Sequence, residues 1–526
     1  MPRRADRFSG PFPPLAAAAS LIAACVVVSG KKLFWMDELF TFLEVSAPTL
    51  RDAIGAAASA ADSSPPLYPA LAWSWARLFG DGETSLRLLG SLCVAGAFAV
   101  TWNLLRRTFG GVAATFGAGA ALCAAPLVLT HNAEARPYGL FLLLAAIAVD
   151  LYERHGRRPR IATLVAWALV HAALVHTHVF GFVYGGALAF AGIVRDVVEG
   201  RRRLAFYLAV PLGWATFAWW WKPLLIDMDV CRPHNWIEPP TLARLMDAFG
   251  NTTPIALALG VVAAVAALRG RREADAGSAS AVAVAEAPPT EAIAAETAAA
   301  PTDDPAPARR LFAAAATFVF VVPLAVFVES RLATSIFLDR YFIPGAVGWA
   351  ILLAAAARRL GGFGDPDAGR AARIVAAASC VAWLAFPAVD AALAPPKVST
   401  GFPRAAAKHP DLPVVFEAPQ AYLPSFHYEP ERARCFYVLD WEAALAEGNA
   451  RNATVDYKLL QGVKSLRPEH NIVPGDAFLA SHPRFLVADV PARRWSELRV
   501  ESNPDYRCTP VDGALLVERV AAAQSR

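Results

Sequence analysis

Two neighbouring carboxylates stand directly after the first long apolar run of the chain, in the stretch "FWMDELFT" at residues 34–41. Asp37 or Glu38 can cap a helix, because a carboxylate accepts the free backbone N–H groups of a helix's first turn. A carboxylate in a membrane protein can also belong to an ion or proton path, or it can act as a general base on a hydroxyl group. Residue type alone leaves these three roles open.

Other side chains with useful chemistry stand in three later stretches, "EARPYGL", "HTHVFGF" and "RYFIP". They supply an acid, two guanidinium groups, an imidazole and a phenol: Glu134, Arg136, His178, Arg340 and Tyr341. A guanidinium binds a carboxylate or a phosphate through paired hydrogen bonds. Plain structural roles also stay open for these groups, namely a local pair between Glu134 and Arg136, and a contact of Arg340 with Asp339 or with lipid headgroups.

Two further sets of residues have simpler interpretations. Glu83 and Arg87 are four residues apart, and this spacing predicts an ion pair at the start of a helix. His171 and His178 are seven residues apart, which is too far along a helix for one metal ion, so we expect no metal ligation there.

The composition indicates a polytopic membrane protein. The chain has 526 residues, of which 56 % are hydrophobic and only 18 % charged, and its mean hydropathy is +0.39. A soluble globular protein has roughly 25 % charged residues and no succession of apolar runs of about 20 residues. A soluble protein is therefore excluded.

Arginine and lysine clusters punctuate the chain and predict its topology, because basic residues favour the cytoplasmic ends of membrane helices. We predict about eleven transmembrane helices, with the N-terminus inside, the C-terminus outside and the first helix not cleaved. The chain would thus be an all-α multi-pass protein of the plasma (inner) membrane. In this topology Asp37 and Glu38 face the extracytoplasmic side. The predicted spans are 12–30, 84–105, 111–129, 138–152, 161–176, 180–194, 204–222, 251–268, 311–328, 338–357 and 374–394.

The last part of the chain has a different character. Short β-like runs between turn residues predict a small extracytoplasmic α/β domain at 395–526, after a transmembrane domain at 1–394. These runs are 412–418, 435–440, 484–490 and 514–520. The Ala/Pro/Glu-rich segment 271–308 is expected to be a disordered cytoplasmic linker. Whether Cys435 and Cys508 pair in an oxidising compartment stays open.

The order of four motifs resembles the GT-C membrane glycosyltransferases. These motifs are the acidic pair, "PPLYPALAWSWARLFGDGETSLR" (65–87), "EARPYGL" (134–140) and "RYFIP" (340–344). Within that superfamily the chain resembles the branch of protein O-mannosyltransferases, aminoarabinose transferases and lipopolysaccharide-core sugar transferases. Ser64 departs from the pattern, because relatives often carry a His, Lys or Glu before the double proline, and Asp62 would have to take over that contact.

The resemblance implies transfer of a sugar from a polyprenyl-phosphate carrier to a hydroxyl acceptor, with inversion, on the extracytoplasmic face. Asp37 would be the general base, with Glu38 beside it, and Glu134 would orient substrate. The donor phosphate would be bound by Arg136, Arg340, Tyr341 and His178. No cofactor is required, although two carboxylates with a lipid phosphate would suit a divalent cation.

The partners expected are thus the lipid-linked sugar donor, a lipid, glycan or protein acceptor of the cell envelope, and membrane lipids, with no nucleic acid. The alternative function is a transporter or flippase of a lipid-linked envelope precursor. A transporter requires charged or broken helices in the middle of the membrane. This chain keeps its acids at one end of its apolar runs, which favours an enzyme.

Overall fold

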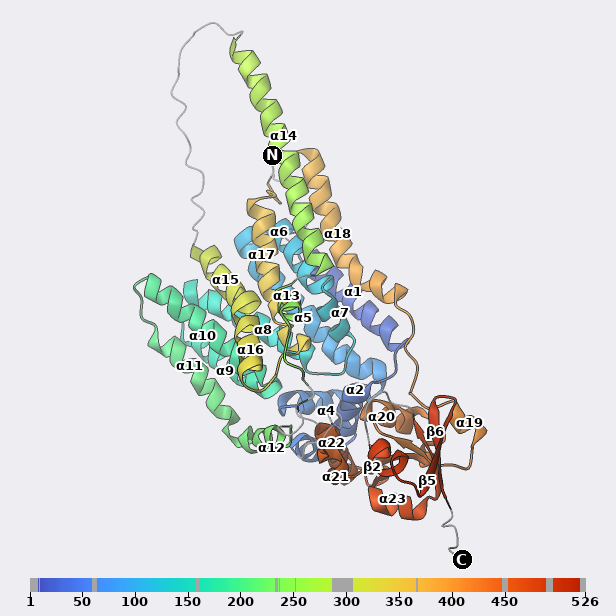
Figure 1. Ribbon diagram of the computed structural model, residues 1–526. Coiled ribbons are helices and arrows are strands. Elements are labelled where there is room, and N and C mark those ends of the chain that lie inside the picture. Colours follow the sequence, from blue (N-terminus) through green and yellow to red (C-terminus); the bar gives the residue numbers. More distant parts are fainter. Residues whose placement is uncertain are drawn as a thin grey trace, which may run out of the picture.

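The computed structural model describes residues 8, 10–58, 64–157, 160–231, 235, 237–250, 252–285, 306–365, 368–446, 453–488 and 495–520. Most of this chain is helical, and the strands lie in its C-terminal part (Figure 1). The helices up to residue 393 form one large bundle, and the C-terminal part lies at one end of it.

Each of the eleven predicted spans contains a helix, because apolar runs of this length favour helix. The helices of the bundle are α1 (Phe12–Ser29), α5 (Glu83–Phe109), α6 (Gly111–Ala118), α7 (Pro126–Asn132), α8 (Tyr138–Arg157), α9 (Ile161–Thr177), α10 (Phe180–Val198), α11 (Leu204–Ala215), α12 (Trp221–Cys231), α13 (Leu242–Ala248), α14 (Thr253–Ala285), α15 (Ala306–Ala316), α16 (Val322–Leu332), α17 (Gly345–Arg359) and α18 (Arg370–Leu393). Three shorter helices follow α1: α2 (Met36–Val45), α3 (Leu50–Ala58) and α4 (Leu67–Phe79).

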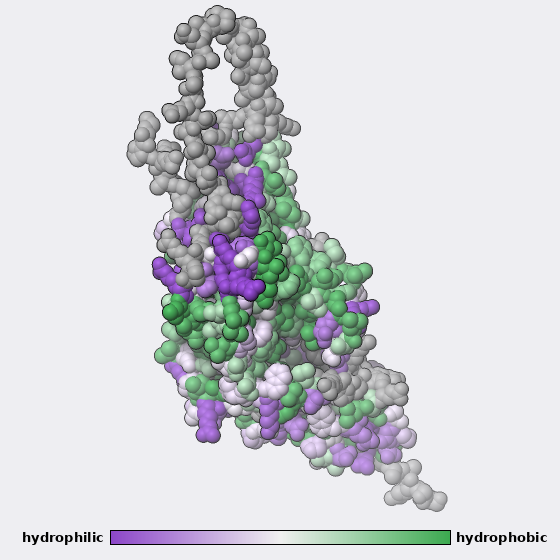
Figure 2. Space-filling view, turned by 90° about the vertical axis from the view of Figure 1, so that its left-hand side faces the viewer, coloured by the Kyte–Doolittle hydropathy of each residue, from purple (hydrophilic) through white to green (hydrophobic). Residues whose placement is uncertain are grey.

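Length and hydropathy identify a multi-pass membrane protein. Among the described residues, five helices are long and apolar enough to cross a membrane, and two bent helix pairs raise this number to seven. Figure 2 shows hydrophobic residues over much of the helical body. Large apolar side chains are exposed on several helices, as expected for a surface in contact with lipid: Leu15, Leu169, Leu212, Leu324 and Val381. The full count of eleven and the orientation stay predictions.

Two segments differ from the sequence prediction. The predicted span 111–129 is broken, since α6 and α7 are bent by 66° around Pro126, which cannot continue the hydrogen-bonding pattern of the preceding helix. Helix α14 continues to Ala285, into the segment 271–308 for which we predicted disorder, because its many alanines favour helix. The rest of that segment up to residue 305 lies outside the described residues.

The C-terminal part is an α/β unit with one six-stranded sheet in the order β3-β2-β1-β4-β6-β5. The four predicted strands are all present, as β1 (Val414–Phe416), β2 (Cys435–Leu439), β4 (Arg484–Ala488) and β6 (Ala514–Arg519), and β3 (Ile472–Pro474) and β5 (Tyr506–Val511) add to them. The strands β1 to β4 pair in parallel, whereas β6 pairs antiparallel with both β4 and β5. The helices of this unit are α19 (Ala405–Lys408), α20 (Pro419–Tyr428), α21 (Trp441–Leu445), α22 (Ala453–Leu466) and α23 (Gly475–Ser481).

The cysteines of this sheet do not pair. Cys435 and Cys508 are free thiols on β2 and β5, and three strands separate these two in the sheet. Strands are about 4.8 Å apart, so the two sulfur atoms lie well beyond bonding distance.

Contacts from α18 and from the C-terminal unit hold the segment that precedes α2. The Nζ of Lys31 donates hydrogen bonds of 2.8–3.0 Å to three carbonyl groups at the end of α18, where the helix dipole favours a cation. Tyr428 of α20 accepts a hydrogen bond from the backbone N–H of Phe34 at 2.8 Å and donates one to Glu83. The segment that precedes α2 is therefore fixed by α18 through Lys31 and by α20 through Phe34.

Candidate active site

Helix α2 begins with a turn that depends on Glu38. Trp35 has an extended backbone, and its N–H donates to Oε2 of Glu38 at 3.3 Å, which is half of a capping box. Glu38 is fully buried and also accepts two hydrogen bonds from Arg87, at 2.8 and 2.7 Å, and one from the backbone N–H of Ala135 at 2.9 Å. Both carboxylate oxygens are thus engaged with N–H donors, so the geometry gives Glu38 a positioning task.

The partner of Arg87 differs from the sequence prediction. Arg87, on α5, pairs with Glu38 rather than with Glu83, and its remaining N–H groups donate to the carbonyls of Lys32 and Leu33 at 2.7 and 2.9 Å. The predicted pair between Glu83 and Arg87 is therefore wrong. The physical reason is that a fully buried guanidinium needs several acceptors at once, which an exposed i,i+4 pair does not provide.

Two glycines place the loop "EARPY" next to α2. A Cβ atom on Gly90 of α5 would lie 2.8 Å from the carbonyl oxygen of Glu134, and one on Gly139 of α8 would lie 2.5 Å from the carbonyl oxygen of Gly90. Only glycine permits this close approach of α5 to α8. The approach brings Ala135 within hydrogen-bonding distance of Glu38.

Asp37 lies next to two arginines that are distant in the sequence. Nη1 of Arg340 is 3.2 Å from Oδ2 of Asp37, and Nη1 of Arg136 donates to the backbone carbonyl of Asp37 at 3.0 Å. The carboxylate of Asp37 is largely buried, with 12 % of the side chain exposed, and the side chain of Arg340 is 23 % exposed. The pair can therefore be reached from outside the bundle.

Arg136 connects the loop after α7 to the segment before α4. Its guanidinium contacts Thr41 Oγ1 at 3.4 Å and Ser64 Oγ at 3.3 Å. Ser64 thus contacts the site although it departs from the pattern of the relatives. Asp62, the suggested replacement, lies outside the described residues.

Arg340 and Tyr341 belong to η4 (Asp339–Phe342), a short turn before α17. The guanidinium carbon of Arg340 lies 5.9 Å from the ring centroid of Tyr138 and 5.8 Å from that of Tyr341, within the range of cation–π attraction. Asp339 pairs instead with Arg244 at 3.4 Å. The aromatic rings keep the Arg340 guanidinium beside Asp37.

Glu134 forms a buried cluster of its own. Its carboxylate is 2.6 Å from Nδ1 of His131 and 3.6 Å from Nζ of Lys32. Burial by itself raises the pKa of Glu134, but the hydrogen bond to His131 and the surrounding cationic side chains outweigh burial and hold this pKa below its usual value. Glu134 is therefore ionised at neutral pH.

His178 lies between α9 and α10 and contacts the ring of Tyr341, which also borders Arg340. Its Nδ1 accepts the backbone N–H of Phe180 at 3.2 Å, which leaves the proton of the neutral ring on Nε2. The ring centroid is 4.8 Å from that of Tyr341. Burial, with the charges of Arg340 and Arg136, lowers the pKa of His178 to about 3, so His178 is a neutral hydrogen-bond donor.

The structure thus gathers the predicted residues into one region, with Glu134 and Glu38 behind Asp37 and with Arg136, Arg340, Tyr341 and His178 around it. Sequence reasoning did not single out Lys32. A signal was available, because Lys31 and Lys32 follow α1 at the end that the predicted topology puts outside, against the usual distribution of basic residues. Within the described residues, no group of three or more His, Cys, Asp or Glu side chains is arranged for a metal ion.

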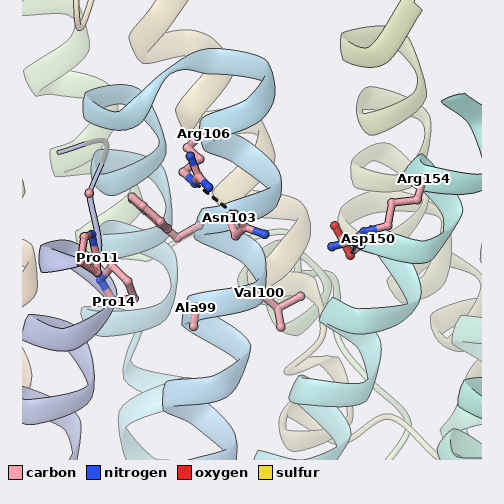
Figure 3. Close-up of a pocket in the computed structure, with 10 residues that line it drawn as sticks. Pro11, Pro14, Ala99, Val100, Asn103, Arg106, Asp150 and Arg154 are labelled. Carbon is pink, nitrogen blue, oxygen red and sulfur yellow. Dashed lines mark hydrogen bonds and ion pairs between the residues drawn. The ribbon is translucent and has the colours of Figure 1, made fainter. Parts of the chain in front are cut away.

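A cavity of about 540 Å³ lies elsewhere, near the C-terminal ends of α5 and α8. Figure 3 shows Pro11, Asn103, Arg106, Asp150 and Arg154 around it. Asn103 follows Arg87 by 16 residues along α5, which corresponds to about 24 Å of helix. This cavity is therefore separate from the region of Asp37.

Comparison with known proteins shows which proteins this chain is similar to. Residues 63–221 match the family model described as dolichyl-phosphate-mannose-protein mannosyltransferase. The match contains the motifs at 65–87 and 134–140. Together with the fold, it confirms the resemblance to the GT-C membrane glycosyltransferases. The chain matches no curated protein sequence.

Two solved structures share the fold over almost the whole chain. One is ArnT from Cupriavidus metallidurans bound to undecaprenyl phosphate, with 14 % identity, a TM-score of 0.51, and coverage of 97 % of this chain and 98 % of that one. The other is the same protein in the apo state, with 14 % identity, a TM-score of 0.54, and coverage of 96 % of each chain. The similarity includes the C-terminal unit, because the aligned region reaches nearly the whole length of both chains.

Proposed function

We propose that this protein transfers a sugar from a polyprenyl-phosphate carrier to a hydroxyl group of an acceptor at the extracytoplasmic face of the plasma membrane. The fold shared with a protein that binds undecaprenyl phosphate supports a polyprenyl-linked donor. The predicted topology supports the side of the membrane. The sugar is a hexose or pentose, and the acceptor belongs to the cell envelope.

The observation that carries this proposal is the grouping of Asp37, Arg340 and Arg136. One carboxylate and two guanidinium groups meet in a buried but accessible position, at the start of a helix that follows an apolar run. This is the set of charges that the transfer needs. A base has to accept a proton from the nucleophile, and cations have to stabilise a phosphate leaving group.

The proposed reaction is a single displacement. The acceptor oxygen attacks the anomeric carbon while its proton passes to a carboxylate oxygen of Asp37. The bond between the anomeric carbon and the phosphate oxygen breaks, and its electron pair remains on the phosphate. Arg340 and Arg136 stabilise the charge that grows there, since charge-assisted hydrogen bonds are strongest where water is excluded. Attack from the face opposite the leaving group inverts the configuration.

The ion pair between Asp37 and Arg340 implies that the donor binds before the Asp37 carboxylate can accept a proton. A donor phosphate competes with the Asp37 carboxylate for the Arg340 guanidinium, whose geometry suits either anion. Once the phosphate is bound, the carboxylate is released toward the acceptor. Tyr341 and the Nε2–H of His178 are then positioned to hydrogen-bond the phosphate.

We propose that Glu38 and Glu134 act without taking a proton. Glu38 orients Asp37 through Arg87 and the loop that carries Arg136. Glu134 is ionised and hydrogen-bonded to His131, so it orients Lys32 or a substrate hydroxyl. A divalent cation, if one is used, would bind Asp37 and the donor phosphate, because both oxygens of Glu38 already accept N–H groups.

Lipid analysis of a deletion strain tests the proposal. The strain is expected to accumulate one polyprenyl-phosphate sugar and to lose that sugar from one envelope polymer. Wild-type protein is expected to clear the lipid, whereas D37N is expected to leave it in place at equal protein level. The matched control is D52N, on an exposed position of α3. Clearance of the lipid by D37N would contradict the assignment of Asp37 as the base.

A further inference from the structure

A second cavity, of about 600 Å³, lies between α2 and the C-terminal α/β unit. One wall is formed by Leu39, Phe42 and Leu43 of α2. The other wall is formed by α20 and by residues 467–471, which precede β3. Figure 1 shows α2 and α20 side by side. The cavity therefore exists only because the C-terminal unit is attached to this part of the bundle.

The cavity is on the opposite side of α2 from Asp37. With 100° per residue, Asp37 and Thr41 lie on one face of the helix, whereas Leu39 and Leu43 lie on the other. The two faces of a helix are about 10 Å apart. A ligand of a few sugar units is longer than this distance.

The walls of this cavity are aromatic. Phe42 and His427 make an edge-to-face contact with ring centroids 4.8 Å apart, and Phe426 stacks on His470 at 3.9 Å. Rigid rings in such pairs present flat apolar faces beside polar ring nitrogens. Surfaces of this kind suit a sugar ring, which has apolar C–H faces and polar edges.

The rim of the cavity is cationic. In the part of the chain that the structure describes, neither Arg432 nor Arg467 forms an ion pair, although Glu469 also lines the cavity. Burial lowers the pKa of His470 to about 4, so the ring of His470 is neutral at neutral pH and the positive charge comes from the guanidinium groups. The net charge of the rim is therefore positive.

Local hydrogen bonds hold the rim in place. Nζ of Lys464 donates to the carbonyls of Pro468 and His470 at 2.8 and 2.7 Å, and the side-chain amide of Asn471 donates to the carbonyl of Ala433 at 2.9 Å. These bonds connect the end of α22 with the turn η5 (Arg432–Arg434). The two arginines are thus supported by an ordered backbone.

We propose that this cavity binds the acceptor, as a sugar chain that carries an anionic group such as a phosphate. The aromatic walls stack on the sugar rings, and Arg432 and Arg467 bind the anion with charge-assisted hydrogen bonds. The inference rests on the proposed transfer to an envelope acceptor and deepens it, since it assigns acceptor selection to the C-terminal unit.

Saturation-transfer NMR with the full-length protein in nanodiscs tests this inference without turnover. The probes are glucose 6-phosphate, glucose and inorganic phosphate. Glucose 6-phosphate is expected to bind, and the double variant R432Q/R467Q is expected to weaken it by about tenfold or more, the effect of losing two charge-assisted contacts. Binding of glucose is expected to be weak and equal in both proteins.

The matched control is R507Q, an exposed arginine on β5 at the opposite edge of the sheet, for which wild-type binding is expected. D37N is expected to keep glucose 6-phosphate binding although it loses transfer, so failure of the proposed chemistry is distinguishable from failure of this inference. Equal binding of glucose 6-phosphate to wild-type and R432Q/R467Q proteins would overturn the inference. Inorganic phosphate binding as tightly as glucose 6-phosphate would also overturn it, because the cavity would then recognise an anion without a sugar.

Discussion

Asp37 and Glu38 are neighbours in the chain but have different surroundings. Glu38 is enclosed by N–H donors from three segments, whereas Asp37 forms a salt bridge to an arginine that is itself partly accessible. The difference arises because successive residues on a helix point about 100° apart. Glu38 is therefore placed to stabilise the fold, and Asp37 is placed to take part in the reaction.

The buried pair of Glu38 and Arg87 gives the first prediction. E38Q is expected to lower the free energy of unfolding by about 3–5 kcal/mol, because it leaves a buried guanidinium without its counter-charge. Thermal unfolding of the purified protein measures this loss. The control is E442Q, at an exposed ion pair with Arg499, where about 0–1 kcal/mol is expected. Equal stability of E38Q and wild type would show that Glu38 does not hold α2 in place.

Arg340 gives a second prediction, on activity. R340K keeps the positive charge but loses the planar fork that binds phosphate through two N–H groups. The donor KM is expected to rise by about tenfold in R340K, and kcat is expected to fall by on the order of 100-fold in R340Q. Steady-state kinetics with the lipid-linked donor measure both values. Wild-type kcat in R340Q would exclude Arg340 from stabilising the leaving group.

His178 gives a pH prediction. Its pKa is about 3 in the folded protein and about 6.5 when unfolded, so the unfolded chain takes up a proton as pH falls below about 6.5 and the folded protein does not. His178 therefore contributes stability that is complete above pH 6.5 and lost toward pH 3. The melting temperature of H178Q is expected to depend less on pH than that of wild type between about pH 7.5 and 5. Parallel curves would contradict the burial of a neutral ring.

At the scale of elements, the site depends on how closely α5 and α8 approach. G90A is expected to destabilise the protein by about 1–3 kcal/mol and to reduce activity, because the new methyl group would meet the backbone of Glu134. Thermal unfolding and transfer assays measure the two effects. The control is G55A on α3, where a Cβ atom meets nothing within 4 Å, and where the change is expected to be neutral or slightly stabilising. A neutral G90A would show that the loop can move without consequence.

The existence of the helices could be predicted from the sequence, but their breaks and contacts could not. Runs of apolar residues predicted α1, α5 and α18 because composition alone determines them. The bend at Pro126 and the extension of α14 depend on local backbone geometry and on alanine content, which a hydropathy argument does not weigh. The strands β3 and β5 were missed because they are short or largely exposed, so they lack a clear apolar pattern.

For the candidate site too, the residues could be predicted from the sequence, but their contacts could not. Motif order and residue type pointed to Asp37, Arg136 and Arg340. The pairing of Arg340 with Asp37 joins residues 303 positions apart, and no local pattern encodes such a contact. The local pair predicted for Arg87 was wrong for the same reason, since its partner Glu38 is 49 positions away.

At the scale of the whole molecule, the account requires that the C-terminal unit and α2 share one side of the membrane, and that this side is extracytoplasmic. Ser481 of α23 and Arg201 between α10 and α11 are exposed positions for labelling. In a background with Cys93, Cys231 and Cys508 replaced by serine, S481C is expected to react with an impermeant maleimide on intact cells. R201C is expected to react only after permeabilisation. The reverse pattern would invert the topology.

The most direct test of the central claim is a single-turnover assay of D37N with the lipid-linked sugar that accumulates in the deletion strain. If the carboxylate of Asp37 takes the acceptor's proton, D37N is expected to bind this donor as tightly as wild type or more tightly, because Arg340 is free of its ion pair. Transfer is expected to be slower by about 100-fold or more, within the range of lost general-base catalysis. Transfer at a rate close to wild type, with the same bound donor, would contradict the claim.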